Sequence, residues 1–416
     1  MMRFAAGRRV RVPASLRALT RIDHGAETPP RALGLDPARV AAVWTACEAL
    51  YRSGLHPAIT LVVRREGRVV LKRSIGAISG TAPDERGPLR TLSPDTPLCL
   101  FSASKSITAL LVHKLAEDGR LDLDDPVADY LPEFGAHGKH RVTIRQLLAH
   151  RAGIPSVPDV KPHPQLLHDW DGLVRRLCAA RPLDPRFRVQ AYHALTCGFV
   201  VGELVRRVSG LELNPALRQW FAEPLGCEHL RYGVAPEWRA QVPRSVHTGP
   251  QPTWWLSAYV RRAIGLPFAE AVAASNHPVF QAAVVPAGNI YATADEVSCV
   301  FQMLLDGGVF GGVRVLRRET IAQALRPLSG PRLDRTLLVP LRFSAGFMLG
   351  ENPFGLFGPR CREAFGHLGF VSVLCWADPR RRISVALLNN GKSVAADGAL
   401  RLAQVLTAIA RAFPPP

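Results

Sequence analysis

The order of elements at the two chain ends constrains the fold of this 416-residue chain more than any other feature. Near the N-terminus, residues 36–54 carry apolar side chains at helical spacing, and Asp36 is a typical residue before a helix. Residues 58–76 follow as two β-branched runs joined at Glu66-Gly67, which predicts an antiparallel hairpin. The chain therefore starts its regular structure with a helix and then a hairpin.

The C-terminal end repeats these elements in reverse. Residues 370–391 predict a hairpin that turns at Asp378-Pro379, and residues 396–413 predict a closing helix. A sheet needs a covered apolar face, and helices beside it can supply that cover. We therefore expect both chain ends to build one α/β layer around an antiparallel sheet.

The middle of the chain has a different character, because it combines helical stretches with proline-rich connections such as SVPDVKPHPQ. Apolar spacing predicts helices at 102–118, 143–150, 197–209 and 214–222. The fold class we expect is α+β, with an antiparallel sheet, terminal helices, a mainly helical inserted domain and an active site between the two. The predicted organisation is an irregular leader at 1–30, a sheet domain at 31–100 and 285–416, and a helical domain at 101–284.

The composition and net charge of the chain indicate which classes of binding partner to expect. The chain is 47% hydrophobic and 21% charged, as expected of a globular protein, and its formal net charge is +18. Such a field favours acidic partners, but the arginines are scattered and form no basic run. We interpret the charge as a solvated surface and expect no nucleic-acid partner.

The cysteines and the N-terminus bear on the compartment. The eight cysteines are widely spaced, without a Cys-x-x-Cys pair or a zinc-like Cys/His cluster, which predicts free thiols and no metal. The arginine-rich start lacks the apolar core of a secretory signal, and no apolar run is long enough to span a bilayer. We expect a cytoplasmic protein, or a mitochondrial-matrix protein if the start is a eukaryotic transit peptide.

The stretch CLFSASKSITALL raises the first question of chemistry, because three alternate serines surround one lysine. On a helix, Lys105 lies three residues after Ser102 and about 60° around the axis, whereas Ser104 and Ser106 lie about 100° from it. Geometry therefore favours Ser102 as the partner of Lys105. A buried lysine can act as the base that a serine nucleophile needs. Ser-x-x-Lys is also a pattern that chance can produce, so this motif needs support from its surroundings.

Support comes from the segments that follow, LAEDGRLDLDDPVADYLPEF and VTIRQLLAHRAGIPS. Over residues 57–392 the sequence resembles the serine β-lactamase and penicillin-binding family, in which a Ser-x-x-Lys helix precedes such an Asp-Pro turn and a T-I-x-x-L-L-x-H helix. The resemblance implies a β-lactamase/transpeptidase-like fold, a second motif that begins with tyrosine and a third on a strand beside the site. Tyr192 and His367-Leu368-Gly369 stand at these places.

What the resemblance implies for catalysis is specific. Ser102 would attack the substrate carbonyl, and Lys105 and Tyr192 would shuttle its proton. The backbone N–H groups of Ser102 and Phe370 would hold the oxyanion, with His367 and Gly369 beside them. Two structural alternatives stay open, an interface role for Tyr192 and a satisfied core role for His367.

Two departures from the family pattern bear on the substrate. The tyrosine motif usually ends in asparagine, which holds the substrate amide, and the third motif usually begins with lysine, which helps to hold a carboxylate. Here Ala194 and His367 stand at these positions, and histidine is mostly neutral near pH 7. The chain is similar to the carboxylesterase branch called class VIII, on the segments AYHALT and VVPAGNIYATADEVSCVFQMLLDGG. We expect a structural role, and no catalytic one, for His150 in the segment LLAHRAGIP.

One further segment, TWWLSAYVRRAIGLPFAEAV at 253–272, is rich in aromatic residues. Three interpretations stay open: an acyl pocket, weak association with an anionic membrane surface, and plain helical core packing. The pocket interpretation names Trp254, Trp255, Tyr259 and Phe268.

The function we expect is a serine hydrolase, most simply a carboxylesterase that cleaves short- to medium-chain esters through an acyl-enzyme on Ser102. Its partner would be a small-molecule ester, and the chemistry needs no cofactor or metal. The chain has no Gly-x-Ser-x-Gly elbow, which argues against an α/β-hydrolase. The alternatives are a β-lactamase or D-alanyl-D-alanine peptidase, and a non-catalytic scaffold that kept the fold.

Overall fold

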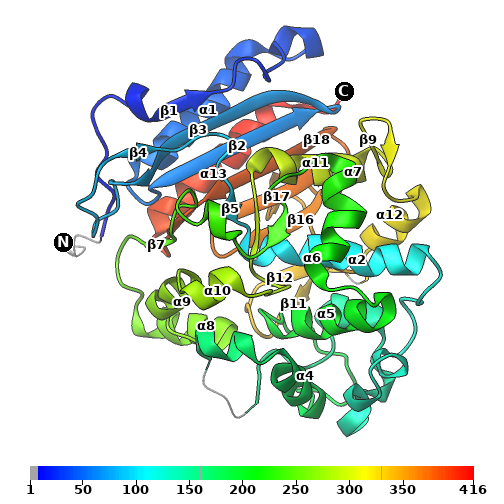
Figure 1. Cartoon of the computed structure of the whole chain (residues 1–416). Coiled ribbons are helices and arrows are strands. Elements are labelled where there is room, and N and C mark those ends of the chain that lie inside the picture. Colours follow the sequence, from blue (N-terminus) through cyan, green and yellow to red (C-terminus); the bar gives the residue numbers. More distant parts are fainter. Residues whose placement is uncertain (1–7, 159–161, 329) are drawn as a thin grey trace.

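A single antiparallel sheet, to which both chain ends contribute, lies at the centre of the computed structural model (Figure 1). The structure describes residues 8–158, 162–328 and 330–416, and for residues 255, 256 and 259 only the helical backbone. The strand order is β1-β3-β2-β18-β17-β16-β13-β12-β11, and β4 pairs with β3. These strands are β1 Thr20–Ile22, β2 Ala58–Arg65, β3 Arg68–Ser79, β4 Arg90–Thr91, β11 Arg332–Leu333, β12 Pro340–Phe343, β13 Met348–Leu349, β16 Phe365–Gly369, β17 Val373–Asp378 and β18 Ile383–Asn389.

The two ends of the chain meet where β2 pairs with β18. The pairing is antiparallel and continuous, from Ile59 opposite Asn389 to Arg65 opposite Ile383. The hairpins turn where the sequence predicts, between β2 and β3 and after Asp378. The expected antiparallel sheet built from both chain ends is thus confirmed.

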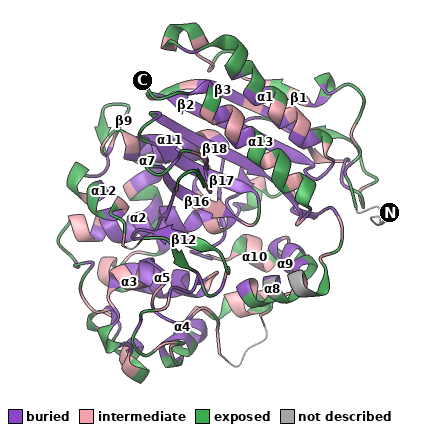
Figure 2. Cartoon of the chain, turned by 180° about the vertical axis from the view of Figure 1, so that it is seen from behind, coloured by how far each residue is buried: buried purple, intermediate pink, exposed green. Residues whose placement is uncertain are grey.

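Both faces of the sheet are covered, so its central strands are buried along their whole length. On one face lie the terminal helices α1 (Pro37–Arg52) and α13 (Ala396–Ala412), which pack against each other (Figure 2). On the other lie α2 (Ser104–Glu117) and α11 (Ala294–Leu305). Because side chains alternate along a strand, neighbouring residues of β18 enter opposite cores: Leu387 faces the terminal helices and Ala386 faces α11.

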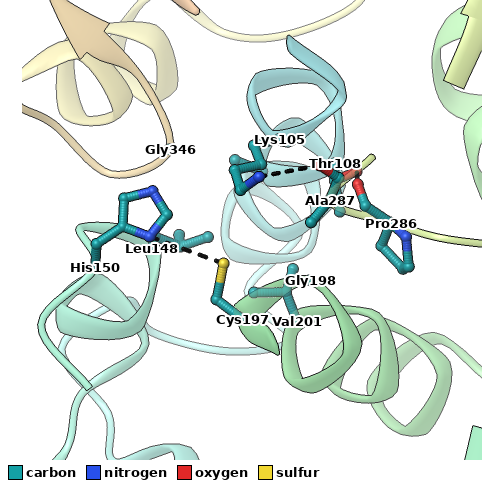
Figure 3. A pocket seen from close by; sticks show the side chains of 11 residues that line it. Lys105, Thr108, Leu148, His150, Cys197, Gly198, Val201, Pro286, Ala287 and Gly346 are labelled. Carbon is teal, nitrogen blue, oxygen red and sulfur yellow. Dashed lines mark hydrogen bonds between the residues drawn. The ribbon is translucent and has the colours of Figure 1, made fainter. Parts of the chain in front are cut away.

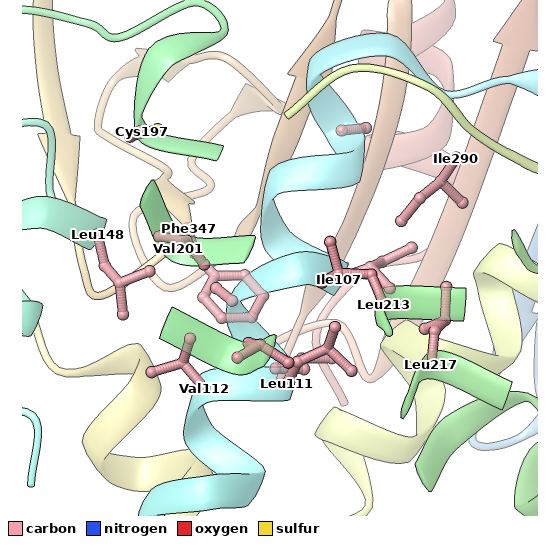
Figure 4. Close-up of a cluster of buried hydrophobic side chains, with 14 of the residues drawn as sticks. Ile107, Leu111, Val112, Leu148, Cys197, Val201, Leu213, Leu217, Ile290 and Phe347 are labelled. Carbon is pink, nitrogen blue, oxygen red and sulfur yellow. The ribbon is translucent and has the colours of Figure 1, made fainter. Parts of the chain in front are cut away.

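The helical half of the molecule surrounds α2. Ile107, Leu111 and Val112 of α2 pack with Val201 of α5 and with Phe347 in one buried cluster (Figure 4). The remaining helices are α3 Ile144–Leu148, α4 Trp170–Ala179, α5 Thr196–Ser209, α6 Leu213–Leu217, α7 Glu223–Leu225, α8 Trp254–Ile264, α9 Phe268–Ser275, α10 Pro278–Ala282 and α12 Arg318–Leu325. None of the helices in the described ranges is long and apolar enough to cross a bilayer.

Short strands complete the fold. They form a three-stranded sheet β5-β8-β6, a parallel pair β7-β19 and the hairpins β9-β10 and β14-β15. Their bounds are β5 Leu98–Cys99, β6 Arg231–Tyr232, β7 Val246–His247, β8 Ile290–Ala292, β9 Val309–Phe310, β10 Val313–Arg314, β14 Phe354–Gly355, β15 Gly358–Pro359 and β19 Gly391–Lys392. Strand β5 leads directly into the segment that carries Ser102.

The predicted leader is less irregular than expected. Within its described residues, 8–30, the strand β1 pairs with β3 at the edge of the sheet. A three-residue strand carries too little alternation to be recognised in a sequence. The domain boundaries at 100/101 and 284/285 stay predictions.

The turn between β12 and β13 fixes α2 against the sheet. Ser106 donates a hydrogen bond to the carbonyl oxygen of Gly346 (3.1 Å), and a ring nitrogen of His113 bonds to that of Ala345 (2.8 Å). Gly346 has φ +106°, and a Cβ there would overlap the methyl group of Ala109 on α2. The turn can approach α2 this closely only with glycine at 346.

Gly346→Ala should therefore destabilise the protein, because the added methyl group forces the turn away from α2. Gly312→Ala is the matched control, since Gly312 also has a positive φ, +82°, but no atom lies within 4 Å of a Cβ there. We expect Gly346→Ala to lower the free energy of unfolding by about 2 kcal/mol more than the control. Urea unfolding followed by circular dichroism measures both, and equal losses would contradict the close packing.

Candidate active site

Ser102 and Lys105 lie together at the start of α2. Ser102 belongs to a 3₁₀ turn, Phe101–Ala103, directly before the helix, which corrects the expected α-helical start at 102. In a 3₁₀ turn, residues three apart lie on the same side, so Ser102 still faces Lys105. The Lys105 Nζ lies 3.1 Å from the Ser102 Oγ. Ser102 is half-buried and Lys105 is buried, which leaves the serine as the accessible member of the pair.

The other two serines of the stretch are occupied elsewhere. The Ser104 Oγ accepts a hydrogen bond from the backbone N–H of Ile290 (3.0 Å), and Ser106 donates to Gly346 as described. Both side chains are buried. The spacing argument thus selects the serine that the structure places against the lysine.

Two backbone carbonyls fix the Lys105 amine. Its Nζ donates to the oxygen of Ala194 (2.7 Å) and to that of Ala287 (3.0 Å). Burial lowers the pKa of Lys105 to about 8. A neutral amine has two N–H bonds and one lone pair. If the carbonyls accept the two N–H bonds, the lone pair is left for the hydroxyl of Ser102, which is the geometry of a general base.

Tyr192 is the third member of the group. Its ring centroid lies 4.9 Å from the Lys105 Nζ, and its side chain is buried. Burial raises the pKa of Tyr192 well above its ordinary value, while a hydrogen bond with Ser102 opposes this shift. The phenol therefore keeps its proton and can pass protons between Ser102 and a leaving group.

Asp334 accepts a hydrogen bond from the backbone of Tyr192, and the sequence analysis did not predict this residue. Its Oδ1 accepts hydrogen bonds from the backbone N–H groups of Tyr192 (3.0 Å), Thr336 (2.9 Å) and Leu337 (2.9 Å), and the residue is fully buried. An aspartate that bonds the N–H two residues ahead is a common turn signal. That signal gives the turn but says nothing of Tyr192, which lies far away in the chain.

His150 and His193 also pack around Tyr192. The His150 ring lies 4.6 Å from the Tyr192 ring and 5.6 Å from the His193 ring. Burial lowers the pKa of His193 to about 3 and that of His150 well below its ordinary value, so both rings are neutral. His150 contacts the site through Tyr192, consistent with the structural assignment from the sequence.

His367 lies on β16, with its ring 6.0 Å from the Tyr192 ring. Its Nδ1 lies 2.7 Å from the carbonyl oxygen of Leu368, so Nδ1 carries the proton and Nε2 presents a lone pair. Nε2 has no hydrogen-bond partner within the described part of the chain. Burial lowers the pKa of His367 to about 3, and the third motif therefore brings no positive charge to the site.

Gly369 brings the third motif against the nucleophile. A Cβ at this position would overlap the carbonyl oxygen of Leu100, in the segment that leads to Ser102. The next residue, Phe370, has its ring 5.2 Å from that of Phe101. Strand β16 thus ends beside the turn that carries Ser102, as an oxyanion hole shared by Ser102 and Phe370 requires.

The structure describes the side chains of two of the four residues that the pocket interpretation of segment 253–272 names, and that interpretation stays a prediction. Trp254 is 83% exposed. Phe268 is 2% exposed and packs in a small core, with its ring 5.4 Å from the Phe370 ring. The side chains of Trp255 and Tyr259 lie outside the described residues. Helical spacing shows which residues share a face, but not which face meets the site.

A small cavity lies behind Lys105, and His150 and Cys197 also line it (Figure 3). Its volume is about 20 Å³, enough for one water molecule and too small for an ester. The cavity therefore belongs to the support of Lys105 and not to the binding of substrate.

Comparison with known proteins identifies the family. The family profile described as Beta-lactamase matches residues 47–409. Esterase/beta-lactamase LipL from Mycobacterium tuberculosis is 33% identical over 310 residues, which cover 72% of this chain and 70% of that protein. A penicillin-binding protein homologue from Caulobacter crescentus superposes with a TM-score of 0.78 at 31% identity, covering 91% of this chain and 98% of that chain.

A solved family VIII carboxylesterase superposes with a TM-score of 0.77 at 28% identity, covering 89% of this chain and 97% of that chain. These matches agree with the antiparallel sheet and the helices described above. The chain therefore belongs to the Beta-lactamase family, with its β-lactamase/transpeptidase-like fold, and is a serine hydrolase.

Proposed function

We propose that the chain is a carboxylesterase that cleaves short- to medium-chain acyl esters through an acyl-enzyme on Ser102. The observation that carries the proposal is the buried Lys105 amine, held by two carbonyls against the Ser102 hydroxyl. The relatives with esterase in their names support the proposal. The neutral side chain of His367, in the third motif, supports it as well. An ester without charge needs only a nucleophile, a base and an oxyanion hole.

In the first half of the proposed reaction, neutral Lys105 takes the proton of Ser102 as its Oγ attacks the ester carbonyl. The carbonyl oxygen becomes an oxyanion, which the N–H groups of Ser102 and Phe370 hold. The intermediate collapses with cleavage of the ester C–O bond. The proton on Lys105 passes through Tyr192 to the leaving alcohol, which leaves an acyl group on Ser102.

In the second half, water attacks the acyl group and gives its proton to Lys105 through Tyr192. Ser102 then recovers its proton and the carboxylic acid departs. The high pKa of Tyr192 suits this role, because a relay must stay protonated between transfers.

We also propose a cytoplasmic location, which the eight free, buried cysteines support.

A β-lactamase is the second candidate, because the mycobacterial relative carries both activities in its name. Against it stand Ala194, whose side chain makes no hydrogen bond to a substrate amide, and the neutral His367. A scaffold role is disfavoured because the Lys105 Nζ lies 3.1 Å from the Ser102 Oγ and 4.9 Å from the centre of the Tyr192 ring.

Ser102→Ala should abolish ester hydrolysis, because it removes the attacking oxygen. We expect turnover of p-nitrophenyl acetate and butyrate to fall by at least about 10³-fold. Ser106→Ala is the matched control and should keep turnover, since Ser106 bonds only to the β12–β13 turn. Nitrocefin is assayed alongside, and fast nitrocefin cleavage with negligible ester turnover would replace the proposal by its second candidate.

The pH dependence of kcat/KM should follow the protonation state of the Lys105 amine. Only the neutral amine accepts a proton, so kcat/KM for p-nitrophenyl acetate should rise with pH and reach half its plateau near pH 8. The Ser102→Ala rate is subtracted at each pH to remove spontaneous hydrolysis. Lys105→Ala should lose most of kcat and this limb of the profile. A profile unchanged by Lys105→Ala would remove Lys105 as the base.

His367→Ala should have a milder effect, since the neutral ring carries no charge to the site. We expect kcat to fall by less than about tenfold, with a change mainly in the preference between acetate and butyrate esters. Steady-state kinetics on both esters measures this. A loss as large as that of Ser102→Ala would instead place His367 in the proton path.

A further inference from the structure

Lys392 is a buried lysine that the proposed reaction does not use. It lies on β19, is fully buried, and donates a hydrogen bond to the carbonyl oxygen of Asn389 (3.0 Å). No carboxylate within the described ranges forms an ion pair with it, and burial lowers its pKa. The ammonium form of a buried lysine without a counter-ion is costly, so other contacts must favour that form.

Those contacts are two aromatic rings beside the nucleophile. The Lys392 Nζ lies 4.6 Å from the ring centroid of Phe101 and 6.0 Å from that of Phe370. The two rings lie 5.2 Å from each other. Phe101 directly precedes Ser102, and Phe370 is the second predicted oxyanion donor. One ammonium group therefore contacts both sides of the proposed oxyanion hole.

The backbone is strained on both sides of this hole. Phe101 has φ +48° and Val371, directly after Phe370, has φ +77°. Bulky residues rarely adopt such values, and they keep them only where the surroundings determine the conformation. The rings of Phe101 and Phe370 are the side chains next to the two donors, and Lys392 contacts both.

We propose that Lys392 is a positioning residue, which clamps the rings of Phe101 and Phe370 and thereby orients the N–H groups of Ser102 and Phe370 toward the oxyanion. The inference rests on the proposed function, since it assumes that these two groups hold an oxyanion. The ring of Phe268 lies 5.4 Å from that of Phe370 and 5.3 Å from that of His247, and His247 is paired with Lys392 between β7 and β19. These contacts hold Phe370 and Lys392 in one packed group. Attraction between an ammonium group and a ring face favours the charged form of Lys392, against the effect of burial.

The test compares two buried lysines. Lys392→Met keeps the length of the side chain and removes its charge. Lys139→Met is the matched control, because Lys139 is also fully buried, donates to backbone carbonyls and lies 5.4 Å from the ring of Phe134, away from the site. Thermal melting first shows that each variant is folded. Steady-state kinetics on p-nitrophenyl butyrate then gives kcat and KM separately.

A second readout is the rate at which a fluorophosphonate labels Ser102, followed by intact mass at pH 7. The Ser102 Oγ bonds to phosphorus, fluoride departs and the proton goes to Lys105, so labelling needs the oxyanion hole but no ester specificity. For Lys392→Met we expect kcat and the labelling rate to fall about 10- to 100-fold, with KM within about threefold. Lys139→Met should change neither rate.

Several outcomes would overturn the inference. These are a folded Lys392→Met protein with wild-type rates, equal losses in the two lysine variants, or no Ser102 labelling in the wild type. If Lys392→Met does not fold, the variant Phe370→Leu tests the inference instead, because it keeps the backbone N–H group and removes the ring. An unchanged kcat and labelling rate in Phe370→Leu would refute the positioning role of Lys392. A wild type that is labelled but does not turn over esters refutes the proposed function alone, and labelling of the variants still tests Lys392.

Discussion

The hydrogen bonds of the Lys105 amine are the interaction on which the site depends. They join three distant parts of the chain, namely the start of α2, Ala194 before α5, and Ala287 before β8. The approach is close because α5 has glycine at 198, where a Cβ would overlap Ala287. Packing therefore sets the direction of the amine lone pair, and burial sets its basicity.

The environment of this amine is polar but carries little charge. Three imidazole rings surround Tyr192 and Lys105, and burial keeps all three neutral. In a buried site, a neutral ring can accept or donate a hydrogen bond without adding a positive charge beside Lys105. The three rings therefore add no positive charge beside Lys105.

The sequence predicted those parts of the structure whose causes are local. The hairpins of β2-β3 and β17-β18 follow from alternation and turn residues, and the Ser102–Lys105 pair follows from spacing along one turn. The places of Tyr192 and His367 came from the family resemblance, since neither carries a local signal. Phe370 came from the same source.

The remaining features depend on tertiary packing. Asp334 bonds to Tyr192 across a long separation in sequence, and Lys392 reaches Phe101 only once β19 is in place. No window of sequence contains both partners of either contact. Trp254 also shows the limit of a local pattern, because helical spacing does not tell which face of a helix is exposed, and this side chain is 83% exposed.

The pairing of β2 with β18 has a consequence for biosynthesis. Ser102 and Lys105 precede β16 and β18 along the chain, so they leave the ribosome before the strand that leads to Phe370 and before the strand that pairs with β2. Until β18 is made, the sheet of the growing chain therefore has a free edge along β2. The proposed hydrolysis needs Phe370, so we expect a chain that stops before β16 to be inactive toward esters and, with β2 unpaired, prone to aggregate.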